Sequence, residues 1–230
     1  MKRYLFVDDN IAFAENLAEI LREEGAHVAV AETGKQAIEL AMGTQFDALV
    51  TDMRMPVMNG AQLVHQIRRV DPGLPAIVVT AYTGENDLLA AREEGLLAVL
   101  PKPVPIDRLV ELLGAARRNG LVALIEDDPS LADNLAEALR DRGFSAVMAQ
   151  SVAETDRLGG VRPFTALVDL RMPGGPDGEA LRHLLQGFPH LPILVMSGHK
   201  DAFRHAGSLP LYPKPFQTGM VLEVVENLWR

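Results

Sequence analysis

The chain carries the same ordered set of chemically distinctive residues twice. In each half an acidic pair is followed by a lone aspartate that precedes Arg-Met-Pro, then by a hydroxyl residue, and last by Pro-Lys-Pro. The spacing is nearly the same in both halves and shortens only between the hydroxyl residue and the lysine of the second. A repeat of roughly 110 residues is too long for a solenoid unit and has the size of a small domain. We therefore expect two copies of one domain, residues 1–118 and 119–230.

Composition narrows the class of protein. Hydrophobic residues make up 48% of the chain, enough for two cores, and no apolar run reaches membrane-spanning length. The net charge of −9 and the lack of a basic patch argue against nucleic-acid binding. Without cysteine the chain can have no disulfide, thiolate metal site or cysteine nucleophile. We expect a cytoplasmic protein that binds neither a membrane nor nucleic acid.

Strand-like and helix-like segments alternate in both halves. Ala76–Val79 is a short apolar run, whereas Asn10–Glu24 has apolar residues at helical spacing and ends at Gly25. Such alternation predicts an α/β fold in which each half is a five-stranded parallel sheet with helices on both faces. Further expected helices include 85–94, 106–118 and 152–158. The link between the halves is so short that the helix at 106–118 is expected to run nearly straight into the second domain.

Polar residues of the first half fall where apolar strands end. Asp8, Asp9 and Asp52 follow strands, and ligands of open α/β sheets bind beyond these carboxyl ends. The three carboxylates should converge, and an oxygen cluster without Cys or His suits Mg²⁺. Thr80 and Lys102 come at two further strand ends and add a hydroxyl and an ammonium group. A metal ion and these two groups around a carboxylate are suited to phosphoryl transfer with the aspartate as nucleophile.

The whole pattern resembles the receiver domain of two-component response regulators. The motifs that carry the resemblance are Asp8-Asp9, Asp52 to Pro56, Thr80-Ala81 and Lys102-Pro103, and then Glu126-Asp127, Asp169 to Pro173, Ser197-Gly198 and Lys214-Pro215. A single aspartate after a strand commonly caps a turn, so the resemblance rests on the full set found twice. It implies two flavodoxin-like (βα)5 receiver domains in tandem, with strand order 2-1-3-4-5 and no output domain.

The resemblance also implies a role for each of these residues. Asp52 and Asp169 would accept a phosphoryl group from a histidine kinase or a histidine phosphotransfer protein. The groups expected to bind the phosphoryl oxygens are the side chains of Thr80, Lys102, Ser197 and Lys214. The expected Mg²⁺ ligands are Asp9 and Asp127, Asp8 and Glu126 partly through water, Asp52 and Asp169, and the backbone carbonyls of Arg54 and Arg171. The peptide bonds before Pro103 and Pro215 are candidates for the cis form.

Some positions depart from the family. Its switch couples the hydroxyl residue to an aromatic three positions before the lysine, where this chain has Val99 and Leu211. Tyr212 lies one position later, and strand alternation would point it to the opposite face. The shorter interval before Lys214 should shorten the fourth helix of the second domain, which in the family belongs to the output and dimerisation face. We therefore expect phosphorylation chemistry in both halves and altered signalling in the second.

Side chains beside each phosphoacceptor could set the lifetime of the phosphoryl group. These are Arg54 and Tyr82 in the first half and Arg171 and His199 in the second. We hypothesise that the bulk of Tyr82 screens the attacking water and slows autodephosphorylation. The alternative is that all four are solvated rim residues.

Three functions remain open. The first is a tandem receiver that acts by phosphorylation-dependent contact with a downstream signalling protein, as a homodimer, or as a phosphate sink. The second is the N-terminal receiver segment of a longer sensor kinase or regulator. The third, an Mg²⁺-dependent aspartyl-phosphate phosphatase, is disfavoured because the haloacid dehalogenase type needs Asp-x-Asp after its first strand, and neither half supplies it. We expect no enzymatic activity beyond self-phosphorylation and autodephosphorylation.

Overall fold

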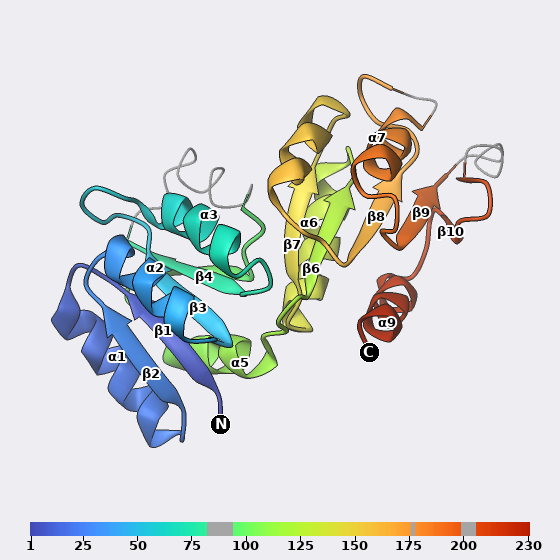
Figure 1. Cartoon of the computed structure of the whole chain (residues 1–230). Coiled ribbons are helices and arrows are strands. Elements are labelled where there is room, and N and C mark those ends of the chain that lie inside the picture. Colours follow the sequence, from blue (N-terminus) through green and yellow to red (C-terminus); the bar gives the residue numbers. More distant parts are fainter. Residues whose placement is uncertain (82–93, 176–177, 199–205) are drawn as a thin grey trace. The chain divides into compact units, whose positions relative to one another are not determined.

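The computed structural model describes residues 1–81, 94–175, 178–198 and 206–230, and contains two five-stranded, all-parallel sheets (Figure 1). The described elements of the first half are β1 (Arg3–Val7), α1 (Ile11–Glu23), β2 (His27–Ala31), α2 (Gly34–Gly43), β3 (Ala48–Asp52), α3 (Gly60–Val70), β4 (Ala76–Thr80), β5 (Ala98–Pro101) and α5 (Ile106–Ala115). Its strand order is β2-β1-β3-β4-β5, as predicted.

The second half repeats this arrangement. Its described elements are β6 (Leu121–Ile125), α6 (Pro129–Asp141), β7 (Ser145–Ala149), the 3₁₀ helix η1 (Ala153–Gly160), β8 (Thr165–Asp169), α7 (Glu179–Gly187), β9 (Ile193–Ser197), β10 (Leu211–Pro213) and α9 (Thr218–Trp229). The strand order β7-β6-β8-β9-β10 again places the first strand between the second and the third. The predicted α/β fold with two receiver-like sheets is therefore confirmed.

Both faces of the first sheet are buried, which explains its continuous apolar strands. Successive residues of β1 alternate between two core clusters, because side chains of a strand point to opposite faces. Tyr4 and Phe6 join one cluster with Leu109 of α5, and Leu5 joins the other with Leu63 of α3. Parallel pairing of β1 with β3, in which Leu5 is opposite Leu49, then sets the ends of these two strands side by side.

One expected helix differs from the structure, and a second cannot be compared with it. The segment predicted as a helix over 152–158 is a 3₁₀ helix, Ala153–Gly160. Thr155 there donates its hydroxyl hydrogen bond to the carbonyl of Val152, and Gly159 and Gly160 end the element, both of which weaken an α-helix. The helix predicted at 85–94 falls almost wholly outside the described residues.

The segment between the halves also differs from expectation. Helix α5 ends at Ala115, so it does not run straight on, and Asn119 takes a left-handed conformation with φ 57°. Arg118 forms a two-pronged ion pair with Asp71, at 2.8 and 2.9 Å, and donates to the carbonyl of Phe46. The last residues of the first half are thus held onto its own loops by a partly buried charge pair.

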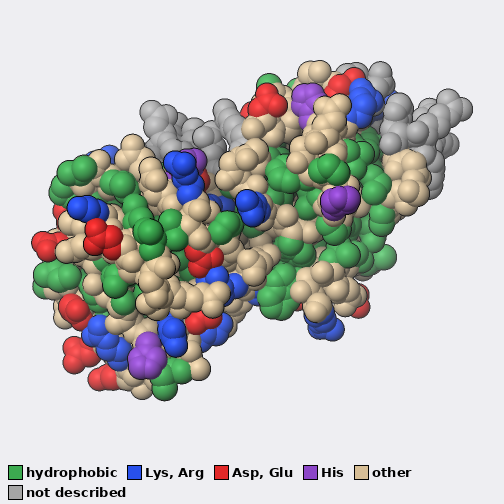
Figure 2. Space-filling view, viewed as in Figure 1, with side chains coloured by type: hydrophobic (Ala, Val, Ile, Leu, Met, Phe, Trp, Pro, Cys, Tyr) green, Lys and Arg blue, Asp and Glu red, His purple; other side chains and the backbone are tan. Residues whose placement is uncertain are grey.

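The chain divides into two compact units, Met1–Asn119 with Arg142–Ser145, and Gly120–Asp141 with Ala146–Arg230. The boundary after residue 118 and the shortened fourth helix stay predictions. On the face drawn in Figure 2, acidic and basic side chains of the first unit are interspersed and form no basic patch. Within the described ranges every helix is too short or too polar to cross a membrane.

Candidate functional site

The site residues of the first half gather at one edge of its sheet. Asp8 directly follows β1, Asp52 ends β3, Thr80 ends β4 and Lys102 follows β5. Because the strands are parallel, all these positions lie at the carboxyl edge, where α/β folds bind ligands. Gly60 keeps the loop after Asp52 tight, since its amide donates to Met53 O at 2.9 Å and an added Cβ would lie 2.4 Å from the Asp52 carbonyl.

Lys102 joins the two central acids of this site. Its Nζ lies 2.7 Å from Oδ2 of Asp8 and 2.8 Å from Oδ1 of Asp52. The remaining oxygen of Asp8 accepts from the amide of Asn10, and that of Asp52 accepts from the amide of Arg54. Burial lowers the pKa of Lys102, but hydrogen bonds and charges from Asp52 and Asp8 outweigh it, so the net pKa is raised. The ammonium therefore stays charged between two carboxylates.

Two further predicted residues lie at this site in different environments. Thr80 is buried, and its carbonyl accepts a 2.8 Å hydrogen bond from the amide of Lys102, which ties β4 to the lysine. The side chain of Asp9, in contrast, is exposed. The structure thus brings Asp8, Asp52 and Lys102 together and leaves Asp9 at the rim.

In the second half the lysine contacts three carboxylate oxygens, one more than in the first. Nζ of Lys214 lies 2.8 and 2.6 Å from the two carboxylate oxygens of Glu126, and 2.5 Å from Oδ2 of Asp169. The other oxygen of Asp169 accepts from the amide of Arg171 at 2.9 Å. Ser197 is buried at the end of β9, and its carbonyl accepts from the amide of Lys214. The same four kinds of residue thus meet here as in the first half.

Burial and charge act in opposite directions on this cluster. The side chain of Glu126 is fully buried, and burial raises its pKa despite the opposing hydrogen bond and charge of Lys214. Burial lowers the pKa of Lys214, but its contacts with Asp169 and Glu126 outweigh this and the net pKa is raised. The buried carboxylates therefore depend on the ammonium as their counter-ion.

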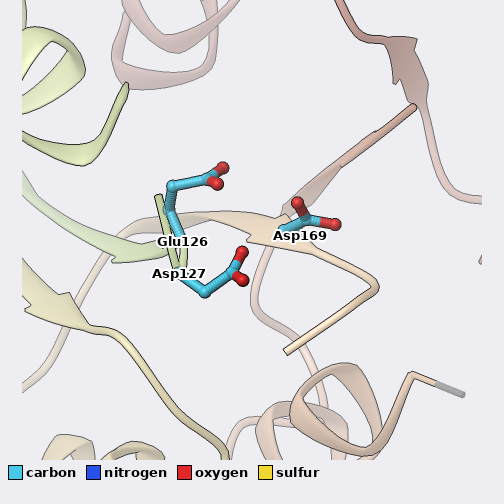
Figure 3. Close-up of side chains that lie close together, drawn as sticks. All are labelled: Glu126, Asp127 and Asp169. Atoms are coloured by element: carbon cyan, nitrogen blue, oxygen red, sulfur yellow. The ribbon is translucent and has the colours of Figure 1, made fainter. Parts of the chain in front are cut away.

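Glu126, Asp127 and Asp169 form an acidic cluster at the ends of β6 and β8 (Figure 3). Each offers one oxygen, and these oxygens lie within 4.8 Å of one another. Among the described residues, the corresponding trio of the first half does not reach this spacing. An all-oxygen set around a position already attractive to a cation fits Mg²⁺, which prefers carboxylate and carbonyl oxygens.

Several other expectations can be compared with the structure. The peptide bonds Lys102-Pro103 and Lys214-Pro215 are both cis, as predicted. Val99 and Leu211, which replace the expected aromatic, pack against the core clusters of their own halves. The side chains of Arg54 and Arg171 are exposed. Tyr82 and His199 lie outside the described residues, so the hypothesis about phosphoryl lifetime stays a prediction.

One contact was missed by the sequence reasoning. The ring of Phe13, in the first turn of α1, lies 4.4 Å from Nζ of Lys102, measured to the ring centroid. A signal was available, because Phe13 is three residues after Asn10, whose side chain accepts from its amide and starts the helix beside the acidic pair.

Comparison with known proteins agrees with this geometry. Residues 4–114 match the family model of the response regulator receiver domain. Over 232 residues the chain is 59% identical to a response regulator receiver protein of Anaeromyxobacter sp. (strain Fw109-5), covering 100% of this chain and 96% of that protein. The chain belongs to the response regulator receiver family. It is therefore a protein of two-component signalling.

Other relatives cover less of the chain. Response regulator MprA of Mycobacterium ulcerans (strain Agy99) is 30% identical over 73% of this chain and 71% of its own length. The transcriptional regulatory protein GlrR of Escherichia coli (strain K12) is 35% identical over 49% of this chain, but only 25% of that protein is covered.

Solved receiver structures match about half of the chain. A CheY-like receiver domain protein from Methanospirillum hungatei JF-1 has a TM-score of 0.48 and 29% identity, covering 50% of this chain and 91% of that one. The receiver domain of sensor histidine kinase PA1611 from Pseudomonas aeruginosa PAO1, described with a magnesium ion in its active-site cleft, has a TM-score of 0.45 and 28% identity, covering 49% and 93%.

Proposed function

We propose that both halves of this receiver protein accept a phosphoryl group, Asp52 in the first and Asp169 in the second. The donor is the phosphohistidine of a histidine kinase or a histidine phosphotransfer protein. The observation that carries this proposal is the shared lysine bridge, in which an ammonium group contacts the first acid and the central aspartate in each half. A carboxylate beside an ammonium group, at the carboxyl edge of a parallel sheet, is a nucleophile with its charge partner in place.

The transfer can be written for Asp52. A carboxylate oxygen attacks the phosphorus, the P–N bond to the donor histidine breaks, and the ring nitrogen keeps the bonding electrons. The other ring nitrogen of the donor carries a proton, so the histidine leaves as a neutral imidazole and Asp52 becomes an acyl phosphate. Lys102 then exchanges its contact with Asp52 for one with a phosphoryl oxygen, and the Thr80 hydroxyl binds another oxygen. The backbone amide of Arg54, already bonded to Asp52, holds the carboxylate during attack.

We propose that each half uses Mg²⁺ in this reaction. The residues that would hold it are the acidic pair and the central aspartate of each half, together with the carbonyls of Arg54 and Arg171. Bound there, the ion would neutralise charge on the transferring phosphoryl group. The compact cluster Glu126, Asp127 and Asp169 fits such an ion by spacing and by its oxygen donors.

Output from the pair is proposed to be non-enzymatic. Phosphorylation would either change contact with a downstream protein or a second copy of the chain, or draw phosphoryl groups away from another regulator as a sink. We place this exchange in the cytoplasm, as the family resemblance implies. A pull-down separates these modes by comparing the Asp52→Ala and Asp169→Ala variants with native protein that has bound beryllofluoride, which mimics the phosphoryl group. Only a contact switch should capture an additional partner in the beryllofluoride-bound form.

The proposal is tested by phosphorylation of the full chain with a small-molecule phosphodonor and Mg²⁺. Intact mass should show two acid-stable, hydroxylamine-sensitive phosphoryl groups on the native chain, one on Asp52→Ala or Asp169→Ala, and none on the double variant. Exposed Asp107 in α5 supplies the control, since Asp107→Ala should keep both groups. Undiminished labelling of the double variant would remove both assignments, and loss of all label in Asp52→Ala alone would mean that the second half is inert.

A further inference from the structure

The lysine of the first site has an aromatic neighbour. Nζ of Lys102 lies 4.4 Å from the centroid of the Phe13 ring, within the range of a cation–π contact. Its carboxylate contacts with Asp8 and Asp52 are both shorter than 3 Å. The ammonium is therefore held by two carboxylates and one ring, and its side chain is only 23% exposed.

Phe13 is placed at this point by the start of α1. Its amide donates to Oδ1 of Asn10 at 3.1 Å, the cap that begins the helix immediately after the acidic pair. The ring is partly buried and packs against the core cluster that contains Phe6 and Leu17. It also lines the small cavity beside Asp8 and Asp52. The ring is thus anchored by backbone and core, and cannot follow the lysine if the lysine moves away.

The second half has a leucine at the corresponding position. Its helix α6 starts in the same way, because Oδ1 of Asp128 accepts from the amide of Leu131 at 3.2 Å, three residues after the cap. Leu131 therefore occupies the position of Phe13. Lys214 has a third carboxylate contact where Lys102 has the ring: two of its contacts are with Glu126 and one is with Asp169. The two lysines are held by different means.

We propose that Phe13 is a positioning residue, whose ring holds the Lys102 ammonium over Asp52 so that it meets the incoming phosphoryl oxygen. Leucine cannot do this in the second half, because it has no ring face to attract a cation. This inference rests on the proposed phosphoryl acceptance at Asp52. It assigns to the first half a means of orienting its lysine that depends on aromatic character and not on side-chain volume.

The experiment measures beryllofluoride affinity in the full chain with Mg²⁺, using fluorine NMR. The background is Asp169→Ala, so that only the first site reports. Phe13→Leu and Phe13→Met should each weaken binding about threefold to tenfold, whereas Phe13→Tyr and Phe13→Trp should stay within about twofold of the parent. Thermal unfolding of each variant checks that it is folded.

The outcomes separate the two proposals. Equal affinity for the parent, Phe13→Leu and Phe13→Met overturns the positioning role. So does equal weakening by all four variants, which would indicate a requirement for the shape of phenylalanine alone. Failure of the Asp169→Ala parent to bind beryllofluoride would overturn phosphoryl acceptance at Asp52, and the positioning role with it. Aromatic rescue with loss in both aliphatic variants is the result expected.

Discussion

The two halves place the same functional groups at the same sheet edge but neutralise their acids differently. In the first, Lys102 divides its contacts between Asp8 and Asp52 and rests on an aromatic ring. In the second, Lys214 contacts Asp169 and both oxygens of a fully buried glutamate. The glutamate thus presents both of its carboxylate oxygens to the lysine, whereas Asp8 presents one. The comparison teaches that the duplicated motifs preserve the lysine bridge between the two acids, whereas the number of carboxylate contacts and the aromatic neighbour differ.

Replacing the site lysine should give the largest difference in stability between the two halves. Lys214→Met leaves Glu126 and Asp169 buried without a counter-ion, and breaking a buried ion pair typically destabilises by about 3–5 kcal/mol. Lys102→Met should have a smaller effect on the first half. The single tryptophan, Trp229 in α9, reports unfolding of the second half by fluorescence in urea without Mg²⁺. Added Mg²⁺ should restore stability to Lys214→Met, and an unchanged urea midpoint would contradict the counter-ion role.

The residues after α5 offer a second contrast, between a partly buried ion pair and an exposed one. Arg118 after α5 pairs with Asp71 at 20% and 17% side-chain exposure and also donates to a backbone carbonyl. Arg118→Gln should destabilise the first half by about 1.5–3 kcal/mol, since it removes charged hydrogen bonds from a partly buried site.

The matched control is Arg108→Gln in α5, whose ion pair with Glu111 is exposed and should change stability by less than about 0.5 kcal/mol. Far-UV circular dichroism in urea compares the two variants. If they unfold at the same midpoint, the anchoring of the linker contributes nothing.

The loops after Asp52 and Asp169 differ at one position of positive φ. Val57 has φ 71° and a fully exposed side chain, and the second half has Gly174, with φ 91°, one position after the corresponding proline. Gly174→Val should destabilise the second half by about 1–2 kcal/mol, because a β-branched residue is strained at positive φ. Val57→Gly should raise stability by less, since the added chain entropy of glycine offsets part of the relief. Opposite signs in urea midpoints are the expected result, and a loss of stability in both would refute the strain.

The smallest expected effect is on pH dependence. The pKa values of Lys102 and Lys214 are raised above 10.5, because carboxylate contacts outweigh burial. Their contribution to stability is therefore present below pH 10.5 and lost as pH rises through the folded pKa. Without Mg²⁺, Trp229 fluorescence should report this alkaline loss in the native chain and a smaller one in Lys214→Met. An equal alkaline loss in both would mean that other groups cause it.

Much of this architecture could be predicted from the repeat alone. The strand ends that carry Asp8, Asp52, Thr80 and Lys102 must meet, because alternating strands and helices form a parallel sheet whose carboxyl ends share one edge. The 3₁₀ form of residues 153–160 could not be predicted with the same certainty, since packing decides whether a weak helical segment tightens. The end of α5 at Ala115 was missed because the anchoring partner of Arg118, Asp71, is distant in sequence.

By itself, the sequence determined the duplication, the α/β order of each half and the set of acid, hydroxyl and lysine at each site. These follow from the spacing of the motifs and from the hydrophobic pattern, both of which can be read directly from the order of residues in the chain. Only the tertiary structure decided which oxygens each ammonium contacts and that a phenylalanine ring lies against Lys102. It also decided that exposed Asp127 joins a compact carboxylate cluster, whereas the equally exposed Asp9 does not. Those outcomes depend on distances between atoms far apart in the chain, and burial fixes them only once both faces of each sheet have packed.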